Sequence, residues 1–223
     1  MLGARTSVLH NGADLSGYRD LAGMRHAARE VLGYRSGAFV VGAIARLDPR
    51  KGLDVLLEAA SAALPRLPGL EVLIVGDGAE RSRLVALSHE RGLHTRVRFA
   101  GEHSDVRPYL AAFDLFAAPS RSEGLGIALV EALAAGVPVA GSRVGGIPEV
   151  LAQGEAGWLV EPTVAAWTEA LVTASRDTAT REHFAHVGPQ AAEAFSLEHM
   201  REVLAAAYRD VLGEAERTHW EAA

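Results

Sequence analysis

The chain has 223 residues, of which 49% are hydrophobic and 22% charged, so it is long enough to bury a substantial core. Its net charge of −6 excludes the basic surface of a nucleic-acid or anionic-lipid binder, and the absence of cysteine excludes disulfides, thiolate metal sites and thiol nucleophiles. No apolar run is long enough to span a membrane and the first residues lack a signal-peptide core, so we expect a cytoplasmic protein.

The N-terminal region predicts a strand, a turn and a helix. Residues 7–10 form a short apolar run that favours a strand, and Asn11-Gly12 directly after it is a strong turn signal. Residues 24–32 have the pattern of a helix.

From residue 37 onward, short apolar strands alternate with amphipathic helices. This alternation predicts βαβ units, which form an α/β Rossmann-like parallel sheet with helices on both faces. In such sheets, ligands bind beyond the carboxyl ends of the strands. The expected strands span residues 38–44, 70–75, 97–100, 115–118, 137–140 and 158–160. The expected helices span residues 53–64, 79–91, 106–112, 127–135 and 164–176.

The C-terminal region, residues 180–216, predicts two helices with a break near Phe195-Ser196, where Ser196 is placed to cap the second helix. We therefore divide the chain into an N-terminal strand and linker, a Rossmann-like domain, and a C-terminal helix and tail. These three parts span residues 1–20, 21–195 and 196–223.

The most informative stretch of the sequence is residues 120–150, SRSEGLGIALVEALAAGVPVAGSRVGGIPEV. Glu123 lies in a glycine-rich loop, Glu131 lies on the helix that follows, and a second glycine loop comes at Gly145-Gly146. Carboxylates accept hydrogen bonds from sugar hydroxyls, while free backbone amides and a helix N-terminus attract phosphate oxygens. The stretch therefore suits a ligand that is rich in both hydroxyls and phosphates.

The spacing of the two glutamates is weak support by itself. The chain has 19 glutamates, and a second pair at the same spacing, Glu161 and Glu169, has no glycine loop around it. We expect that second pair to be exposed to solvent, so the glycine context makes the first pair informative.

Two cations follow the first main strand, in the stretch ARLDPRKG that begins at Ala45. Lys51 is the only lysine in a chain that otherwise uses arginine, and its compact charge suits a phosphate. Neutral drift also explains a single lysine, but its position just before a helix favours a selected phosphate contact. Arg46 is the second candidate cation.

Two other patterns carry less weight. Gly76-x-Gly78 resembles part of a dinucleotide-binding loop, but Arg81 replaces the third glycine, so a tight turn is the better interpretation. His183 and His186 lie three residues apart on an expected helix without further ligands nearby, which favours a surface position over a metal site. Because there is also no Asp-x-Asp pair, we expect no metal and no cofactor.

Together these motifs resemble the group 1 glycosyltransferases, also called glycosyltransferase family 4. The resemblance runs from about residue 7 to the last helix, and its joint pattern is specific. The motifs that carry it are GAIARLDPRKG from Gly42, GDG from Gly76, VRFAG from Val97, DLFAAPSRSEGLG from Asp114 and GVPVAGSRVGGIPE from Gly136. Residues 11–14, NGAD, resemble the point where the family's chain passes into its C-terminal, donor-binding domain.

The resemblance implies the two-domain GT-B fold, a nucleotide-diphosphate sugar as donor, hexosyl transfer that retains the configuration of the sugar, and no metal. It places Arg46 and Lys51 on the donor's diphosphate, Glu123 on the transferred sugar and Glu131 on the ribose hydroxyls. Leu125 departs from the pattern, since phenylalanine is commoner there. The implied catalytic residues are Glu123, Arg46 and Lys51, and the implied donor-binding residues are Arg46, Lys51, Glu123, Gly124, Leu125, Gly126, Ile127 and Glu131.

The resemblance also implies a partner, because the family's N-terminal acceptor domain is not in this sequence. We expect the donor-binding half of a glycosyltransferase, either as a fragment or as one subunit of a split enzyme. One alternative is a nucleotide-sugar-binding module without catalysis. A GT-B sugar epimerase is a further alternative, which the glutamate loop disfavours. Association with a membrane stays open, because in such enzymes it usually depends on the N-terminal half.

Overall fold

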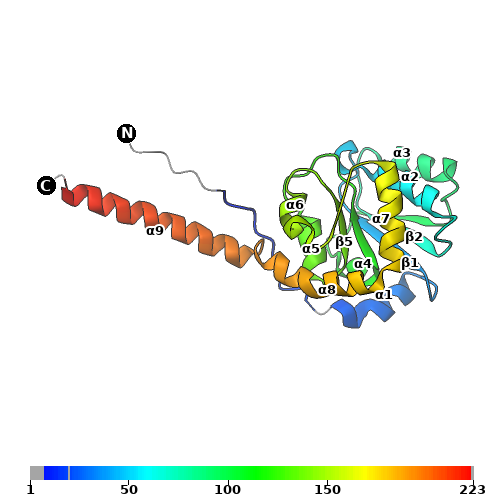
Figure 1. Cartoon of the computed structure of the whole chain (residues 1–223), viewed down its shortest axis with the longest axis horizontal. Helices are drawn as coiled ribbons and strands as arrows, with labels where there is room; N and C mark the ends of the chain where they lie inside the picture. The colour runs from blue at the N-terminus through cyan, green and yellow to red at the C-terminus, as the bar shows by residue number, and fades with distance from the viewer. Residues whose placement is uncertain (1–7, 20, 222–223) are drawn as a thin grey trace.

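The protein is built around one parallel six-stranded sheet with the strand order β3-β2-β1-β4-β5-β6 (Figure 1). It is described here by a computed structural model that covers residues 8–19 and 21–221, with side chains up to residue 212. The expected α/β Rossmann-like fold is confirmed. The strands are β1 (Phe39–Ile44), β2 (Leu70–Val75), β3 (Val97–Gly101), β4 (Leu115–Ala118), β5 (Val139–Ser142) and β6 (Trp158–Val160).

Helices cover both faces of the sheet and divide the core into two apolar clusters. Side chains from α2, α3 and α7 bury one face, and side chains from α1, α4, α5 and α8 bury the other. The α-helices are α1 (Arg25–Val31), α2 (Leu53–Ala63), α3 (Arg81–Glu90), α4 (Arg107–Ala112), α5 (Ile127–Ala134), α6 (Ile147–Val150), α7 (Val164–Arg176), α8 (Thr178–Glu193) and α9 (Leu197–Glu221). Short 3-10 helices lie at Leu21–Met24, Pro49–Lys51 and Ala152–Gly154.

The strand order reverses between β1 and β4, which lie side by side at the centre of the sheet. From β1 the chain adds β2 and then β3 toward one edge of the sheet. It then crosses back to place β4 on the other side of β1, and β5 and β6 follow toward the opposite edge. In open parallel sheets, ligands bind at such a reversal, between the two loops that leave the adjacent strands. Here those loops are residues 45–52 and 119–126, which hold most of the predicted site residues.

Close packing in the sheet explains the glycine at the middle of β1. A Cβ atom at Gly42 would lie 2.0 Å from the ring of Phe113, which is buried against the strand. On the other face, Trp167 of α7 is fully buried and its indole N–H donates to the hydroxyl of Ser142, so this tryptophan belongs to the core.

The structure corrects two expected elements. Residues 8–10 form no strand, and Ser7 lies outside the described residues. The segment instead makes a single parallel bridge between Ala13 and Ser196, too short to continue as a ladder. The strand expected at 137–140 begins two residues later, at Val139, because Pro138 has no N–H with which to join the ladder.

The C-terminal region contains the two expected helices, α8 and α9, which meet near Phe195. The hydroxyl of Ser196 accepts a hydrogen bond from the amide of His199 at 3.1 Å, so Ser196 caps α9 as expected. Figure 1 shows α9 as a long helix that extends away from the globular part of the chain.

Candidate functional site

The loops that follow β1, β2 and β4 are joined to one another by backbone hydrogen bonds. The Leu47 amide donates to the Asp77 carbonyl at 2.8 Å, which joins the β1 loop to the β2 loop. The Arg121 amide donates to the Arg50 carbonyl at 2.7 Å, which joins the β4 loop to the β1 loop. These three loops therefore meet at one edge of the sheet, at the carboxyl ends of their strands.

Gly76 permits the closest of these approaches. Its φ of +129° lies in a region that favours glycine, and a Cβ atom there would lie 1.9 Å from the carbonyl oxygen of Ala45. The Gly76-x-Gly78 motif thus makes the tight turn that the sequence favoured.

A second glycine pair supports the loop that carries Glu123. The Gly146 amide donates to the Gly124 carbonyl at 2.9 Å. A Cβ atom at Gly145 would lie 1.8 Å from the carbonyl oxygen of Glu123. Gly145 and Gly146 therefore pack directly against the backbone of the Glu123 loop. The sequence did not predict this role for them.

Lys51 and Glu123 form an ion pair across the reversal of strand order. The Lys51 Nζ atom lies 2.6 Å from Oε2 of Glu123, although the two residues are 72 positions apart in the sequence. Their side chains are 25% and 15% exposed, so water screens the pair only in part. The Ser120 hydroxyl donates to the same carboxylate oxygen at 3.3 Å.

Arg46 is exposed and pairs with Asp48 in its own loop. Its guanidinium contacts Oδ2 of Asp48 through Nη2 at 2.9 Å and Nε at 3.1 Å, and its side chain is 67% exposed. Asp48 also accepts from the side chain and the amide of Arg50 and so begins the short helix at Pro49–Lys51. These hydrogen bonds, the one from the Arg50 side chain first, lower the pKa of Asp48 to about 2.

Glu131 lies on α5 and accepts a hydrogen bond from the Tyr18 hydroxyl at 2.7 Å. Burial raises the pKa of Glu131, and the hydrogen bond from Tyr18 lowers it in part. The pKa of Tyr18 is itself raised, first by burial and then by the hydrogen bond to the carboxylate.

The glycine loop leads directly into the N-terminus of α5. Gly126 is the N-cap residue with φ +79°, and among the described residues no side chain caps this helix end. Ile127 begins the helix and is 39% exposed, Gly124 is exposed, and Leu125 packs partly buried against the core. The first N–H groups of α5 have no acceptor within the helix and are directed toward this edge of the sheet.

Two adjoining cavities open between the loops. The larger, about 570 Å³, is lined by Arg46, Glu131 and residues 76–78 together with Glu102 and His103. The smaller, about 50 Å³, is lined by Lys51 and Glu123. Both cavities are lined by Ile44, Ala45, Ile127 and Ala128, so the four predicted charged side chains line two neighbouring cavities with common walls.

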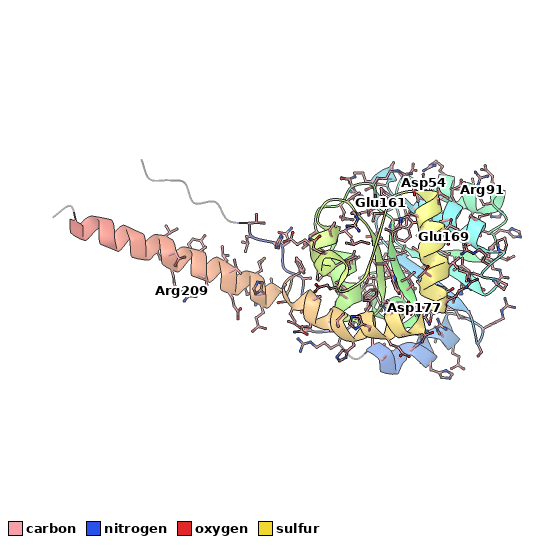
Figure 2. All side chains as sticks on the ribbon, in the orientation of Figure 1. Asp54, Arg91, Glu161, Glu169, Asp177 and Arg209 are labelled. Carbon is pink, nitrogen blue, oxygen red and sulfur yellow. The ribbon has the colours of Figure 1, made fainter. Side chains whose placement is uncertain are left out.

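Glu161 and Glu169, the second pair at the same spacing, are exposed to solvent, as expected (Figure 2), and neither lines one of the two cavities. Glu161 pairs with Arg143 and Glu169 pairs with Arg66, so each takes part in a separate surface ion pair. His183 and His186 are also exposed, in agreement with their interpretation as surface residues. Among the described residues, no three His, Asp or Glu side chains gather closely enough to hold a metal ion.

Sequence reasoning missed Asp48 and Tyr18, each of which contacts a predicted site residue. Asp48 carries a recognisable signal, because an aspartate before proline is a common start of a helical turn. Tyr18 carries none, since it lies outside every motif and 113 positions from its partner.

The chain is similar in sequence and in fold to several known proteins. Residues 24–191 match the family model described as glycosyl transferases group 1. A D-inositol 3-phosphate glycosyltransferase of Mycobacterium tuberculosis is 36% identical over 221 residues, a match that covers 95% of this chain and 45% of that protein. The chain thus spans about half the length of the curated relatives it matches.

Solved structures extend the comparison. HepE of Anabaena, in a complex with UDP and glucose, is 29% identical with a TM-score of 0.83, over 93% of this chain and 59% of that one. The C-terminal domain of a group 1 glycosyl transferase, LpcC of Francisella tularensis, gives a TM-score of 0.73 at 23% identity, over 83% of this chain and 100% of that domain. At that identity the likeness concerns the fold alone, which is that of a GT-B C-terminal domain.

Within the described part of the chain, no helix combines the length and the apolar character needed to cross a membrane.

Proposed function

This chain belongs to the group 1 glycosyl transferases, and on that premise we propose that it is the donor-binding half of a retaining glycosyltransferase. The proposed reaction transfers a hexosyl group from a nucleotide-diphosphate sugar to a hydroxyl of an acceptor. Arg46, Lys51 and Glu123 are the proposed catalytic residues. Glu131 and residues 124–127 complete the proposed donor site.

The observation that carries this proposal is the contact between Lys51 and Glu123 across the reversal of strand order, 2.6 Å apart. It brings the proposed phosphate-binding cation and the proposed sugar-binding carboxylate to the point where open parallel sheets bind ligands. The adjoining cavity of about 570 Å³ lies in the size range of small-molecule sites. HepE, which is similar over nearly all of this chain, binds UDP-glucose, and this supports a donor of that class.

The proposed chemistry follows from where charge develops. When the bond between the sugar and the diphosphate breaks, negative charge builds on the departing diphosphate. The acceptor oxygen forms the new bond to the anomeric carbon, and its proton passes to an oxygen of the departing diphosphate. Lys51, Arg46 and the N-terminus of α5 would stabilise the diphosphate charge as it forms, which lowers the barrier. Glu123 would orient the sugar and support positive charge at its anomeric carbon. Retention of configuration is proposed from the family resemblance.

The ends of the donor are assigned by the same reasoning. Glu131 would accept from the ribose hydroxyls, and the loop after Gly101, whose Glu102 and His103 line the larger cavity, would contact the base. We also propose that binding needs no metal, since two cations and a helix N-terminus supply positive charge. Titration in the presence of EDTA should give the same affinity as titration with added Mg²⁺.

The second candidate function is a nucleotide-sugar-binding module without catalysis. The ion pair between Lys51 and Glu123 is the observation that favours this function, because each proposed catalytic charge is neutralised by the other. Transfer of a sugar to any acceptor by this chain would eliminate the pure binding module.

Calorimetric titration with UDP, GDP and ADP and their hexose derivatives tests the donor site. Lys51→Ala and Glu131→Ala should each weaken binding about tenfold or more, because hydrogen bonds to charged groups contribute roughly 1.5–3 kcal/mol. Glu161→Ala is the matched control, an exposed glutamate in a separate ion pair, and should bind as the wild type does. Equal affinity in all three variants would refute the proposed site.

A further inference from the structure

The hydroxyl of Tyr18 is fixed against one oxygen of the proposed ribose-binding carboxylate. It donates to Oε1 of Glu131 at 2.7 Å, and the ring packs partly buried against the core. The other oxygen, Oε2, has no hydrogen-bond partner among the described residues. One oxygen of the Glu131 carboxylate is therefore fixed by Tyr18, and the other is available to accept from a ligand.

The backbone on the N-terminal side of Tyr18 is anchored by hydrogen bonds to residues of the α8–α9 junction. The Ala13 amide donates to the Phe195 carbonyl at 2.9 Å, and the Leu197 amide donates to the Ala13 carbonyl at 2.8 Å. Leu15 is buried, and the Tyr18 amide donates to its carbonyl at 3.2 Å. This short segment is thereby joined to the junction between α8 and α9.

The next residue toward the N-terminus also has a close neighbour. A Cβ atom at Gly17 would lie 2.8 Å from the Arg107 side chain at the start of α4. Arg107 itself pairs with Asp105. The segment therefore packs against α4 while its tyrosine reaches α5.

We propose that Tyr18 is a positioning residue, which orients the Glu131 carboxylate so that the site distinguishes ribonucleoside from deoxyribonucleoside diphosphates. This inference rests on the proposed function, in which Glu131 binds the ribose. A carboxylate held at one oxygen loses rotational freedom before the ligand arrives, and such preorganisation is what makes a hydrogen-bonding site selective.

The charge state of Glu131 supports the same role. Burial favours the protonated acid, whereas the hydrogen bond from Tyr18 favours the carboxylate. The ionised carboxylate is purely an acceptor, whereas the protonated acid carries a donor O–H on one oxygen, so loss of the tyrosine hydroxyl removes both the orientation and part of the stabilisation of the accepting form.

The test compares ribose and deoxyribose ligands in Tyr18→Phe, which removes one hydroxyl and retains the ring. Calorimetry with UDP, GDP and ADP, and with the 2′-deoxy and 3′-deoxy form of each, gives the ratio of ribo to deoxy affinity. For the base that binds tightest, the wild type should prefer the ribose form by roughly tenfold or more. In Tyr18→Phe the ratio should fall to about twofold or less, with deoxy affinity unchanged.

The ratio separates positioning from a general structural effect, because a distorted site would weaken ribose and deoxyribose ligands alike. Tyr208→Phe is the matched control, since Tyr208 is 63% exposed on α9, and it should keep the wild-type ratio. Glu131→Gln should also lose the preference, and adding Tyr18→Phe to it should cause no further loss.

A wild-type ratio in Tyr18→Phe, alongside clear discrimination by the wild type, would overturn the role of Tyr18 and leave the donor site standing. Binding by the wild type without any preference for ribose would overturn the ribose assignment of Glu131 and this inference with it. No binding of any nucleoside diphosphate by the wild type would defeat the donor site itself.

Discussion

Lys51 and Glu123 form an ion pair in the structure, so a phosphate that binds Lys51, as proposed, would compete with Glu123 for the same ammonium group. The pair is close, at 2.6 Å, and only partly exposed. Arg46 is paired in a similar way with Asp48. At the scale of single residues, the proposed diphosphate site therefore holds its cations in place with acids that a ligand must displace.

This competition predicts that Glu123→Gln binds a free nucleoside diphosphate more tightly than the wild type. Removing the carboxylate charge frees Lys51, and the gain should be about three- to tenfold, on the order of 1 kcal/mol. Lys51→Met should have the opposite effect. Titration with UDP, GDP and ADP measures both variants.

Glu161→Gln serves as the control for loss of one negative charge, because Glu161 is exposed, forms its own ion pair with Arg143 and lines neither cavity of the site, and it should leave affinity unchanged. If Glu123→Gln bound the free diphosphate more weakly than the wild type, then Glu123 would not compete with phosphate for Lys51.

At the scale of elements, the site depends on loops that support one another from neighbouring strands. The loop after β5 holds the loop after β4, through the amide of Gly146 and the close approach of Gly145 to Glu123. Because β4 and β5 are adjacent and parallel, these loops leave the same edge of the sheet. The residues that position Glu123 thus lie more than twenty positions away in sequence, in a loop with no charged site residue of its own.

Gly145→Ala should weaken binding of nucleotide sugars at least tenfold while the fold is retained. Its φ of +53° and the 1.8 Å approach of a Cβ atom to the Glu123 carbonyl oxygen force the Glu123 loop to move. Such shifts of about 1 Å commonly cost two orders of magnitude in enzyme activity. Titration with UDP-glucose and thermal unfolding should be measured together.

Gly92→Ala is the control that measures the loss of stability caused by a left-handed backbone conformation alone. Gly92 has φ +70° but no atom within 4 Å of an added Cβ, so it should lose only about 1–2 kcal/mol of stability and bind normally. Normal binding by Gly145→Ala would show that the loop after β5 does not position Glu123.

At the scale of the whole molecule, the residues that stabilise the fold and the residues of the proposed site lie at different parts of the sheet. The buried clusters lie on its two faces, whereas the predicted charged residues lie at the carboxyl edge of the strands. Gly42 and Phe113 illustrate the part that stabilises the fold, because the phenylalanine ring occupies the space where a side chain on β1 would lie.

Gly42→Ala should lower the free energy of unfolding by about 1–3 kcal/mol, since a Cβ atom would lie 2.0 Å from the Phe113 ring. Adding Phe113→Leu should recover part of that loss, giving a coupling of roughly 0.5–3 kcal/mol. Urea unfolding of the wild type, the two single variants and the double variant measures this coupling. Strict additivity of the two changes would contradict the proposed contact, and nucleotide affinity of the folded variants should stay unchanged.

Much of the fold was predictable because its signals are local. Apolar runs and helical periodicity identified the strands and most helices, and β2, β4, β6 and α7 have the expected bounds. The two expected strands that differ from the structure do so for separate reasons. The apolar run at 8–10 has no neighbouring strand to pair with, and Pro138 delays β5 because it cannot donate to a ladder.

The sequence by itself determined the fold class, the family and the loops in which charged side chains follow strands, because glycine positions and hydrophobic periodicity act on neighbouring residues. Only the tertiary structure decided which side chains meet. It paired Lys51 with Glu123, Arg46 with Asp48, and Glu131 with Tyr18. The physical reason is that strand order and helix packing bring together residues as far apart as 113 positions, and no local pattern records that distance.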